Sequence, residues 1–131
     1  MENSIIGKRE IVVTDELTAA AVDASLPSVF STPQLISLIE MTAAKSVESM
    51  LEPGQTTVGT VINVKHMAAT PVGMTISCET VLREREKNRL EFDVKAYDDK
   101  ELVAEGTHQR FIIKKDKFMQ RAEQKTSPDH A

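Results

Sequence analysis

The sequence predicts an α+β fold in which an antiparallel β-sheet curves around one long central helix. One helical pattern of about five turns covers residues 32–51. The segments before and after it alternate between apolar and polar residues, as half-buried strands do. The later strands are joined by short linkers, which favours antiparallel pairing because parallel neighbours need long crossovers. A strongly apolar helix must then bury itself against that sheet.

The first part of the chain predicts one strand and the helix. Residues 8–13 have a strand pattern, and the Pro and Ser content of residues 23–31 indicates a loop. Pro33 suits the first helical position, and Thr32 before it is the expected N-cap. A Pro-Gly turn at residues 53–54 ends the helix.

Four strands follow the helix. The inner face of the first is predicted to carry Val58, Thr60, Ile62, Val64 and His66. The inner faces of the next two are predicted to carry Met74, Ile76, Cys78, Thr80 and Leu82, then Leu90, Phe92, Val94 and Ala96. The last strand spans residues 102–113, and Gly106 is expected to mark a bulge in it. A sheet wrapped in this way around a helix is the hotdog architecture.

Length, charge and cysteine content limit the possible function classes. The chain has 131 residues, which predicts a single domain over residues 1–131, with an ordered core at about 5–118 and a polar tail at 119–131. The net charge of −4 argues against a nucleic-acid partner. No apolar run resembles a signal peptide or a membrane span. The single cysteine, Cys78, rules out an intramolecular disulfide, and we expect a cytoplasmic protein without a membrane partner.

Glu40 is the unusual residue of the helix. It lies among Ile36, Ala43 and Val47, where a core helix normally carries an aliphatic side chain. A buried carboxylate needs a partner or a raised pKa, whereas one at the edge of the apolar face reaches water. The pattern leaves both alternatives open.

His66 strengthens the case for chemistry at this position. Alone on an apolar strand it would most often be a satisfied core residue. Its predicted face packs against the helix face that carries Glu40, and two inward ionisable groups on touching elements make a better candidate site than either alone. Thr32 is the third candidate, because a hydroxyl at a helix N-terminus lies where an anion is favoured, although capping the helix would also explain it.

Other polar residues have simpler explanations. Gly59 either lets a ligand approach the strand backbone or marks a bulge. We expect His108 to be a surface or edge residue and Cys78 to be a small core residue. Two His and one Glu do not have a close metal-ligand spacing, so no metal or other cofactor is expected.

Three segments, "VFSTPQLISLIE", "TTVGTVINVKHMAATPVG" and "EGTHQRF", resemble the fluoroacetyl-CoA thioesterase-like family of hotdog proteins. The resemblance covers roughly residues 26–111. It implies hydrolysis of a short-chain acyl-CoA to free acid and CoA, at a site on a dimer interface. It also implies a homodimer, with a tetramer as a further option, and no cofactor beyond the CoA of the substrate.

The resemblance further implies roles for individual residues. The catalytic Thr, Glu and His of the family fall on Thr32, Glu40 and His66, and the glycine whose N–H faces the thioester carbonyl falls on Gly59. The substrate-binding positions fall on Leu26, Phe30 and Arg110. Where the fluoroacetyl-selective enzyme has an aromatic side chain before the Pro of this motif, the present chain has Leu26, which favours a generic short acyl group.

Two alternatives use the same fold. A non-catalytic module that binds acyl-CoA or another small ligand would keep the pocket, but binding alone does not require a buried acid and base. A hydratase would place a His and an acidic residue close together on a helix, and no such pair is present in the sequence.

Overall fold

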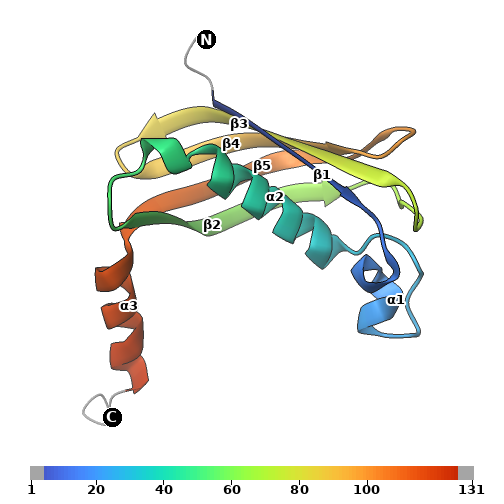
Figure 1. Cartoon of the computed structure of the whole chain (residues 1–131), viewed down its shortest axis with the longest axis horizontal. Helices are drawn as coiled ribbons and strands as arrows, with labels where there is room; N and C mark the ends of the chain where they lie inside the picture. Colours follow the sequence, from blue (N-terminus) through green and yellow to red (C-terminus); the bar gives the residue numbers. More distant parts are fainter. Residues whose placement is uncertain (1–4, 127–131) are drawn as a thin grey trace.

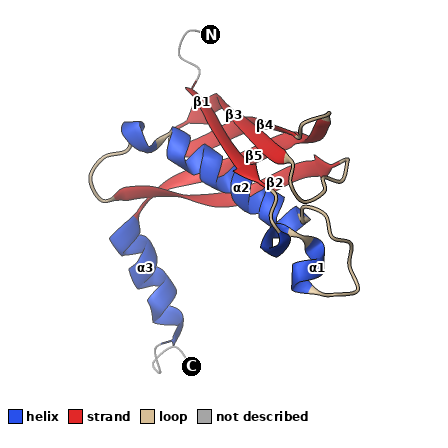
Figure 2. Ribbon diagram, turned by 45° about the vertical axis from the view of Figure 1, so that its right-hand side comes forward, coloured by secondary structure: helices blue, strands red, loops and turns tan. Residues whose placement is uncertain are grey.

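A five-stranded antiparallel sheet with helix α2 (Thr32–Ser46) packed across one face forms the body of the protein (Figures 1 and 2). The computed structural model describes residues 5–126. The strands are β1 (Ile5–Val12), β2 (Gln55–His66), β3 (Thr75–Glu86), β4 (Arg89–Tyr97) and β5 (Leu102–Lys114). Their order in the sheet is β1-β3-β4-β5-β2, so β1 and β2 are the two edges. The α+β prediction of a sheet around one long helix is confirmed.

The alternation of apolar residues in β3 and β4 produces a buried inner face. Ile76, Cys78, Thr80, Leu90, Phe92, Val94 and Ala96 are all buried there. The outer residues of β4 are polar, and antiparallel pairing with β3 and β5 aligns each inner residue with inner neighbours. The inner faces predicted for these strands are therefore confirmed, except that Met74 precedes β3 and is only half-buried, and Cys78 is a buried free thiol, as expected.

Helix α2 begins after Ser31 rather than after Thr32. The Ser31 hydroxyl accepts a hydrogen bond from the Gln34 N–H at 3.3 Å, so Ser31 is the N-cap and Pro33 lies in the first turn. The prediction that Thr32 caps the helix was wrong, because Thr32 already belongs to the first turn and its side chain is free for other contacts. A short 3₁₀ helix, η2 (Glu48–Met50), continues the predicted span after α2 ends at Ser46.

The buried face of α2 consists of Leu35, Leu38, Ile39, Thr42 and Ala43. Full burial of one such aliphatic side chain stabilises the fold by about 1.5–3 kcal/mol. Glu40 lies at the border of this face and is half-buried. Glu40 therefore lies at the edge of the apolar face, where it reaches water, rather than fully buried within it.

Strand β2 contains a β-bulge that its alternation pattern does not predict. Gly59 pairs with Arg110 and Val61 with Gln109, which leaves Thr60 as an extra residue. Val58 and Thr60 therefore do not share the inner face of His66, and that part of the prediction was wrong. The bulge expected at Gly106 was also wrong, because Gly106 keeps regular pairing with Val64 and Val94. A side chain at Gly106 would meet the backbone of Asn63 instead.

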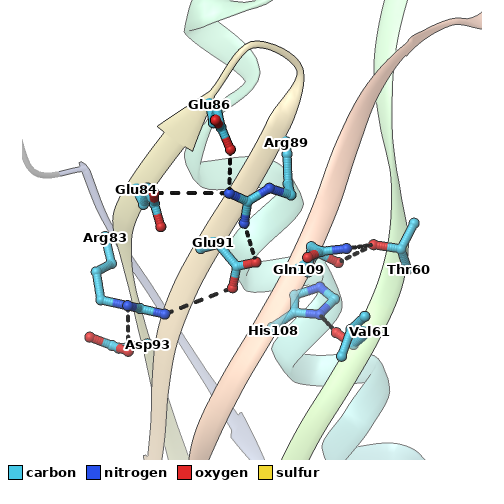
Figure 3. Close-up of polar contacts among 10 residues, drawn as sticks. All are labelled: Thr60, Val61, Arg83, Glu84, Glu86, Arg89, Glu91, Asp93, His108 and Gln109. Carbon is cyan, nitrogen blue, oxygen red and sulfur yellow. Dashed lines mark hydrogen bonds and ion pairs between the residues drawn. The ribbon is translucent and has the colours of Figure 1, made fainter.

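The hairpin between β3 and β4 carries a cluster of ion pairs (Figure 3). Arg89 contacts Glu91 at 2.6 Å and Glu86 at 2.8 Å, and Arg83 contacts Asp93 at 3.1 Å. The turn itself places Lys87 in the left-handed region, with φ of 56°. Except for the half-buried Glu91 and Arg89 these groups are largely exposed, so each pair adds little stability.

A helix, α3 (Lys115–Glu123), extends from the end of β5 away from the sheet (Figure 1). It is followed by a 3₁₀ turn, η3 (Gln124–Thr126). The polar tail predicted from residue 119 therefore begins inside a helix, and its last residues, 127–131, lie outside the described residues. In residues 5–126 no helix combines the length and hydropathy needed to cross a bilayer. The remaining elements, η1 (Asp15–Leu17) and α1 (Ala19–Val22), lie beside the start of α2, where the Ser31 N–H donates to the Leu17 carbonyl (Figure 1).

Candidate active site

The segment just before α2 is fixed by backbone hydrogen bonds to two other loops. The Phe30 N–H donates to the Thr70 carbonyl at 2.8 Å, and the Ser31 N–H donates to the Leu17 carbonyl at 3.0 Å. Phe30 is 1% exposed, and its side chain anchors the same segment by packing into the hydrophobic core. These contacts determine where the first turn of α2 begins and hence where Thr32 lies.

Thr32 and His66 form a hydrogen bond at the start of the helix. Thr32 Oγ1 lies 2.8 Å from His66 Nδ1, across 34 residues of sequence. His66 is the last residue of β2, and the Phe30 ring meets its imidazole edge to face with centroids 6.5 Å apart. Partial burial lowers the pKa of His66, so the neutral imidazole is favoured near pH 7.

The other imidazole nitrogen of His66 is unused. Nε2 is buried and has no hydrogen-bond partner among the described residues. A neutral imidazole carries one proton, so Thr32 decides the role of Nε2. If Nδ1 donates to Thr32, Nε2 is a free base; if the Thr32 hydroxyl donates to Nδ1, Nε2 is a hydrogen-bond donor.

A cavity of about 260 Å³ adjoins this pair. It has room for a small acyl group and has a mixed apolar and polar wall, as ligand sites commonly have. Its lining consists of Ala19, Val29, Phe30, Ser31, Thr32, His66, Met67, Ala68 and Ala69. Leu26, a predicted substrate-binding residue, is absent from this lining and is 46% exposed on the loop before Phe30.

Glu40 forms the second part of the site, against β2. A Cβ atom built on Gly59 would lie 2.7 Å from Glu40 Oε2 and 3.2 Å from Arg110 Nη1. The absence of a side chain at Gly59 therefore gives the carboxylate its place against the strand. Within residues 5–126 no ion pair within 4 Å involves Glu40.

Arg110 is a buried cation on the inner face of β5. Its Nε donates to Thr57 Oγ1 at 2.8 Å and its Nη2 donates to the Thr57 carbonyl at 3.0 Å. Burial lowers the pKa of this guanidinium, and the negative charge of Glu40 partly opposes that effect. Arg110 remains charged, because a guanidinium loses its proton only in strongly basic solution.

His108 was predicted to be a surface or edge residue, and that prediction was wrong. It is 1% exposed, stacks on Phe92 with ring centroids 6.0 Å apart, and contacts both Val61 and Arg110. The sequence held a signal that was not used: His108 alternates with Arg110 and Ile112 on one face of β5, and that face is the inner one.

The structure thus brings the predicted residues together in two groups. Thr32, His66 and Phe30 lie at the N-terminal end of α2, whereas Glu40, Gly59 and Arg110 lie further along it. Eight residues of helix separate Thr32 from Glu40, which is about 12 Å. Gly59 and His66 lie roughly 20 Å apart along β2. No three His, Cys, Asp or Glu side chains in the described part of the chain are placed to hold a metal ion.

Comparison with known proteins assigns the chain to a family. A family model described as fluoroacetyl-CoA-specific thioesterase, FlK, matches residues 13–116. The chain belongs to this family. A fluoroacetyl-CoA thioesterase from Streptantibioticus cattleyicolor is 39% identical over 103 residues, which cover 79% of this chain and 74% of that protein. The resemblance inferred from the three sequence segments is confirmed.

Solved structures agree on the fold. A structure of the fluoroacetyl-CoA thioesterase FlK superposes with a TM-score of 0.91 at 33% identity, covering 97% of this chain and 98% of that one. A hot-dog-like protein from Thermanaerovibrio acidaminovorans has a TM-score of 0.85 at 20% identity, with 93% and 90% covered. The hotdog prediction is therefore confirmed as well.

Proposed function

We propose that this protein hydrolyses a short-chain acyl-CoA to the free acid and CoA, using Thr32, Glu40 and His66. Membership of the fluoroacetyl-CoA-specific thioesterase family supports the general activity of a thioester hydrolase. The observation that carries the proposal for this site is the Thr32–His66 hydrogen bond of 2.8 Å, which leaves a buried, unpartnered His66 Nε2 beside a cavity. A core histidine without a function would normally have both nitrogens satisfied.

The residues supply the groups that thioester hydrolysis requires. Water or a carboxylate attacks the carbonyl carbon, the carbonyl oxygen becomes negative, and the C–S bond breaks to release the CoA thiolate. Glu40 either attacks directly, forming a transient anhydride that water then hydrolyses to the free acid, or removes the proton from the attacking water, and a carboxylate can take either role. The Gly59 N–H is proposed as the donor to the oxyanion, and His66 as the group that activates water or polarises the carbonyl.

We further propose that two chains complete each site. Strand β2 is an edge of the sheet, so its outer side is open to pairing with a second copy. A two-fold axis at Asn63 would pair the two β2 strands antiparallel and, because Thr60 is an extra residue, set Gly59 of one chain opposite His66 of the partner subunit. Glu40 would then share a site with the partner's Thr32 and His66. This pairing would explain why Glu40 lies far from Thr32 and His66 within one chain.

The substrate is proposed to be a generic short acyl-CoA. The cavity beside His66 is small, which suits a short acyl group. Leu26 is an exposed aliphatic residue where the fluoroacetyl-selective enzyme has an aromatic one, so the contact that would favour a fluorinated acyl group is reduced. Cys78 is buried and free, which fits the proposed cytoplasmic location.

Thiol release from a panel of short acyl-CoAs tests the activity. We expect the wild type to turn over at least one substrate, and Glu40→Gln and His66→Ala each to lose about 10²–10⁴ in rate. A wild type that binds acyl-CoA without releasing thiol would replace this function with that of a binding module. Thermal unfolding of each variant, with and without CoA, separates lost chemistry from lost folding.

A mixing experiment tests the two-chain site. Glu40→Gln and His66→Ala subunits are co-expressed with different tags, so that random pairing makes half of the dimers mixed. In a mixed dimer one of the two sites has both native groups if Glu40 and His66 come from different chains, so about a quarter of wild-type activity returns. If both groups act from the same chain, every site keeps one lesion and the mixture stays inactive.

A further inference from the structure

The bulge in β2 determines which residues face α2. Gly59 and His66 are separated by seven positions, an odd number, so a regular strand would direct them to opposite faces of the sheet. The extra residue, Thr60, changes the alternation, and both Gly59 and His66 face inward. The two halves of the proposed site therefore share one face because of this bulge.

Two consecutive residues of β5 hold the bulge from opposite faces of the sheet (Figure 3). On the outer face, Gln109 Nε2 donates to Thr60 Oγ1 at 2.8 Å, and the Thr60 hydroxyl donates to the Gln109 carbonyl at 3.2 Å. On the inner face, His108 Nδ1 lies 2.8 Å from the Val61 carbonyl oxygen. The carbonyl of a bulged strand is thus satisfied by a side chain of the neighbouring strand.

The partners of His108 define its protonation. A carbonyl oxygen only accepts, so Nδ1 carries the proton and donates to Val61. A guanidinium only donates, so Nε2 is unprotonated and accepts from Arg110 Nη1 at 3.2 Å. Burial is the main cause that lowers the pKa of His108, and the positive charge of Arg110 acts in the same direction, whereas the Val61 bond and the charges of Glu40 and Glu91 oppose it.

His108 thereby links the bulge to the Glu40 carboxylate. Arg110 Nε and Nη2 are bound to Thr57, and the bond from Nη1 to His108 fixes the remaining direction of the guanidinium. Both Glu40 Oε2 and Arg110 Nη1 border the space above Gly59. A change at His108 would shift the backbone beside Gly59 and the cation beside Glu40 together.

We propose that His108, held as the neutral Nδ1–H tautomer between Val61 and Arg110, is a positioning residue that sets the β2 bulge and the Arg110 guanidinium relative to Glu40. This inference rests on the proposed thioesterase function for its catalytic consequence. Its structural content, the tautomer and the bulge, does not depend on that function. His108 is not placed against the substrate and takes no part in bond making or breaking.

Three substitutions separate the two bonds of His108. His108→Leu removes both, His108→Asn keeps a donor near the position of Nδ1, and His108→Gln keeps an acceptor near the position of Nε2. We expect His108→Leu to lower kcat by about 10²-fold while KM changes only a few-fold, since a misplaced group costs rate rather than binding. His108→Asn or His108→Gln should recover part of that loss. Ile76→Val, a core change on β3 away from the site, is the control and should keep the wild-type kcat.

A double-mutant cycle with Arg110→Lys tests whether His108 acts through Arg110. If it does, the two losses in kcat do not multiply, because the second substitution removes a contact that is already lost. Losses that multiply fully would contradict the proposal, and so would a wild-type kcat in His108→Leu. A fall in kcat matched by an equal fall in the Ile76→Val control would also contradict it, because a general loss of folding would then be sufficient.

Nitrogen NMR of the imidazoles tests the proposal without an enzyme assay. In uniformly ¹⁵N-labelled wild type at pH 7, the signals absent from His108→Asn are expected to show a protonated Nδ1 and an unprotonated Nε2. Amide hydrogen exchange at residues 59–62 should accelerate in His108→Leu and return towards wild type in His108→Asn. An Nε2–H tautomer, an imidazolium, or unchanged exchange would overturn the inference. If the wild type hydrolyses no acyl-CoA while both signatures are present, the proposed function fails and the structural inference stands.

Discussion

Replacing Gly59 by Ala would displace the Glu40 carboxylate, the proposed catalytic group, by an amount that the structure gives. The added Cβ would lie 2.7 Å from Glu40 Oε2, whereas ordinary contact begins at 3.4 Å. Oε2 must therefore retreat by about 0.7 Å, the difference of these two distances. Oε2 is the end of a flexible side chain, so the fold can absorb the change. A displacement approaching 1 Å in a reacting group costs up to about 10²-fold in rate.

We expect Gly59→Ala to lower kcat by about 10- to 100-fold and to change the free energy of unfolding by no more than about 1 kcal/mol. Thiol release with the best acyl-CoA of the panel gives kcat, and urea denaturation gives stability. Gly106→Ala is the contrasting variant, because its Cβ meets the backbone of Asn63, which cannot rotate away. Gly106→Ala should therefore lower the free energy of unfolding more than Gly59→Ala does. An undiminished kcat in folded Gly59→Ala would show that the position of the Glu40 carboxylate does not limit the reaction.

Four further outcomes are expected. Thr32→Val should lower kcat by about 2- to 10-fold, because it removes a hydrogen bond worth roughly 0.5–1.5 kcal/mol, whereas Thr32→Ser keeps the hydroxyl and most of the rate; a wild-type rate in Thr32→Val would remove Thr32 from the site. Burial lowers the pKa of His66, so below about pH 6.5 the unfolded chain binds a proton that the folded chain does not, and the folded state loses stability. The urea midpoint of the wild type should therefore decrease from pH 7 to pH 5.5, and it should decrease less steeply in His66→Ala. Equal slopes in the two proteins would contradict this. With Leu26 in place of an aromatic residue, kcat/KM for fluoroacetyl-CoA should exceed that for acetyl-CoA by no more than about tenfold, and a preference of several orders of magnitude would refute the generic acyl assignment. Lys87→Asn should raise the free energy of unfolding by up to about 1 kcal/mol at unchanged kcat, because Asn tolerates a φ of 56° better than Lys does. Calorimetry measures this change, and a less stable Lys87→Asn variant would contradict the reasoning.

The sequence contained most of the information needed for the fold. Alternation identified the inner faces of β3 and β4 because most of their inner residues are apolar and most of their outer residues polar, up to Leu82 in β3 and throughout β4. It failed in β2, where one inserted residue, Thr60, reverses the phase without altering the composition. Ser31 and Thr32 are both good N-caps in sequence, and only the hydrogen bond to Gln34 distinguishes them.

The candidate site was predictable in its residues but not in its geometry. Glu40 and His66 stood out because each is ionisable within an apolar pattern. Sequence spacing did not reveal that they belong to two separate groups, since that depends on how α2 crosses β2. His108 was expected to be a surface or edge residue, although its alternation with Ile112 on β5 indicated the inner face.

The open edge of β2 has a consequence for how the chain behaves before it finds a partner. Twelve residues of extended backbone are exposed along one side of an isolated chain, and such an edge is a template for aggregation. Lys65 and the bulge at Thr60 interrupt the flat ladder that indiscriminate strand addition needs. The proposed pairing about a two-fold axis would cover the β2 edge of both chains and leave only the shorter β1 edges open. If the proposed dimer forms, newly made protein at high concentration would be prone to aggregation only until pairing is complete, and dilution would favour the single chain again.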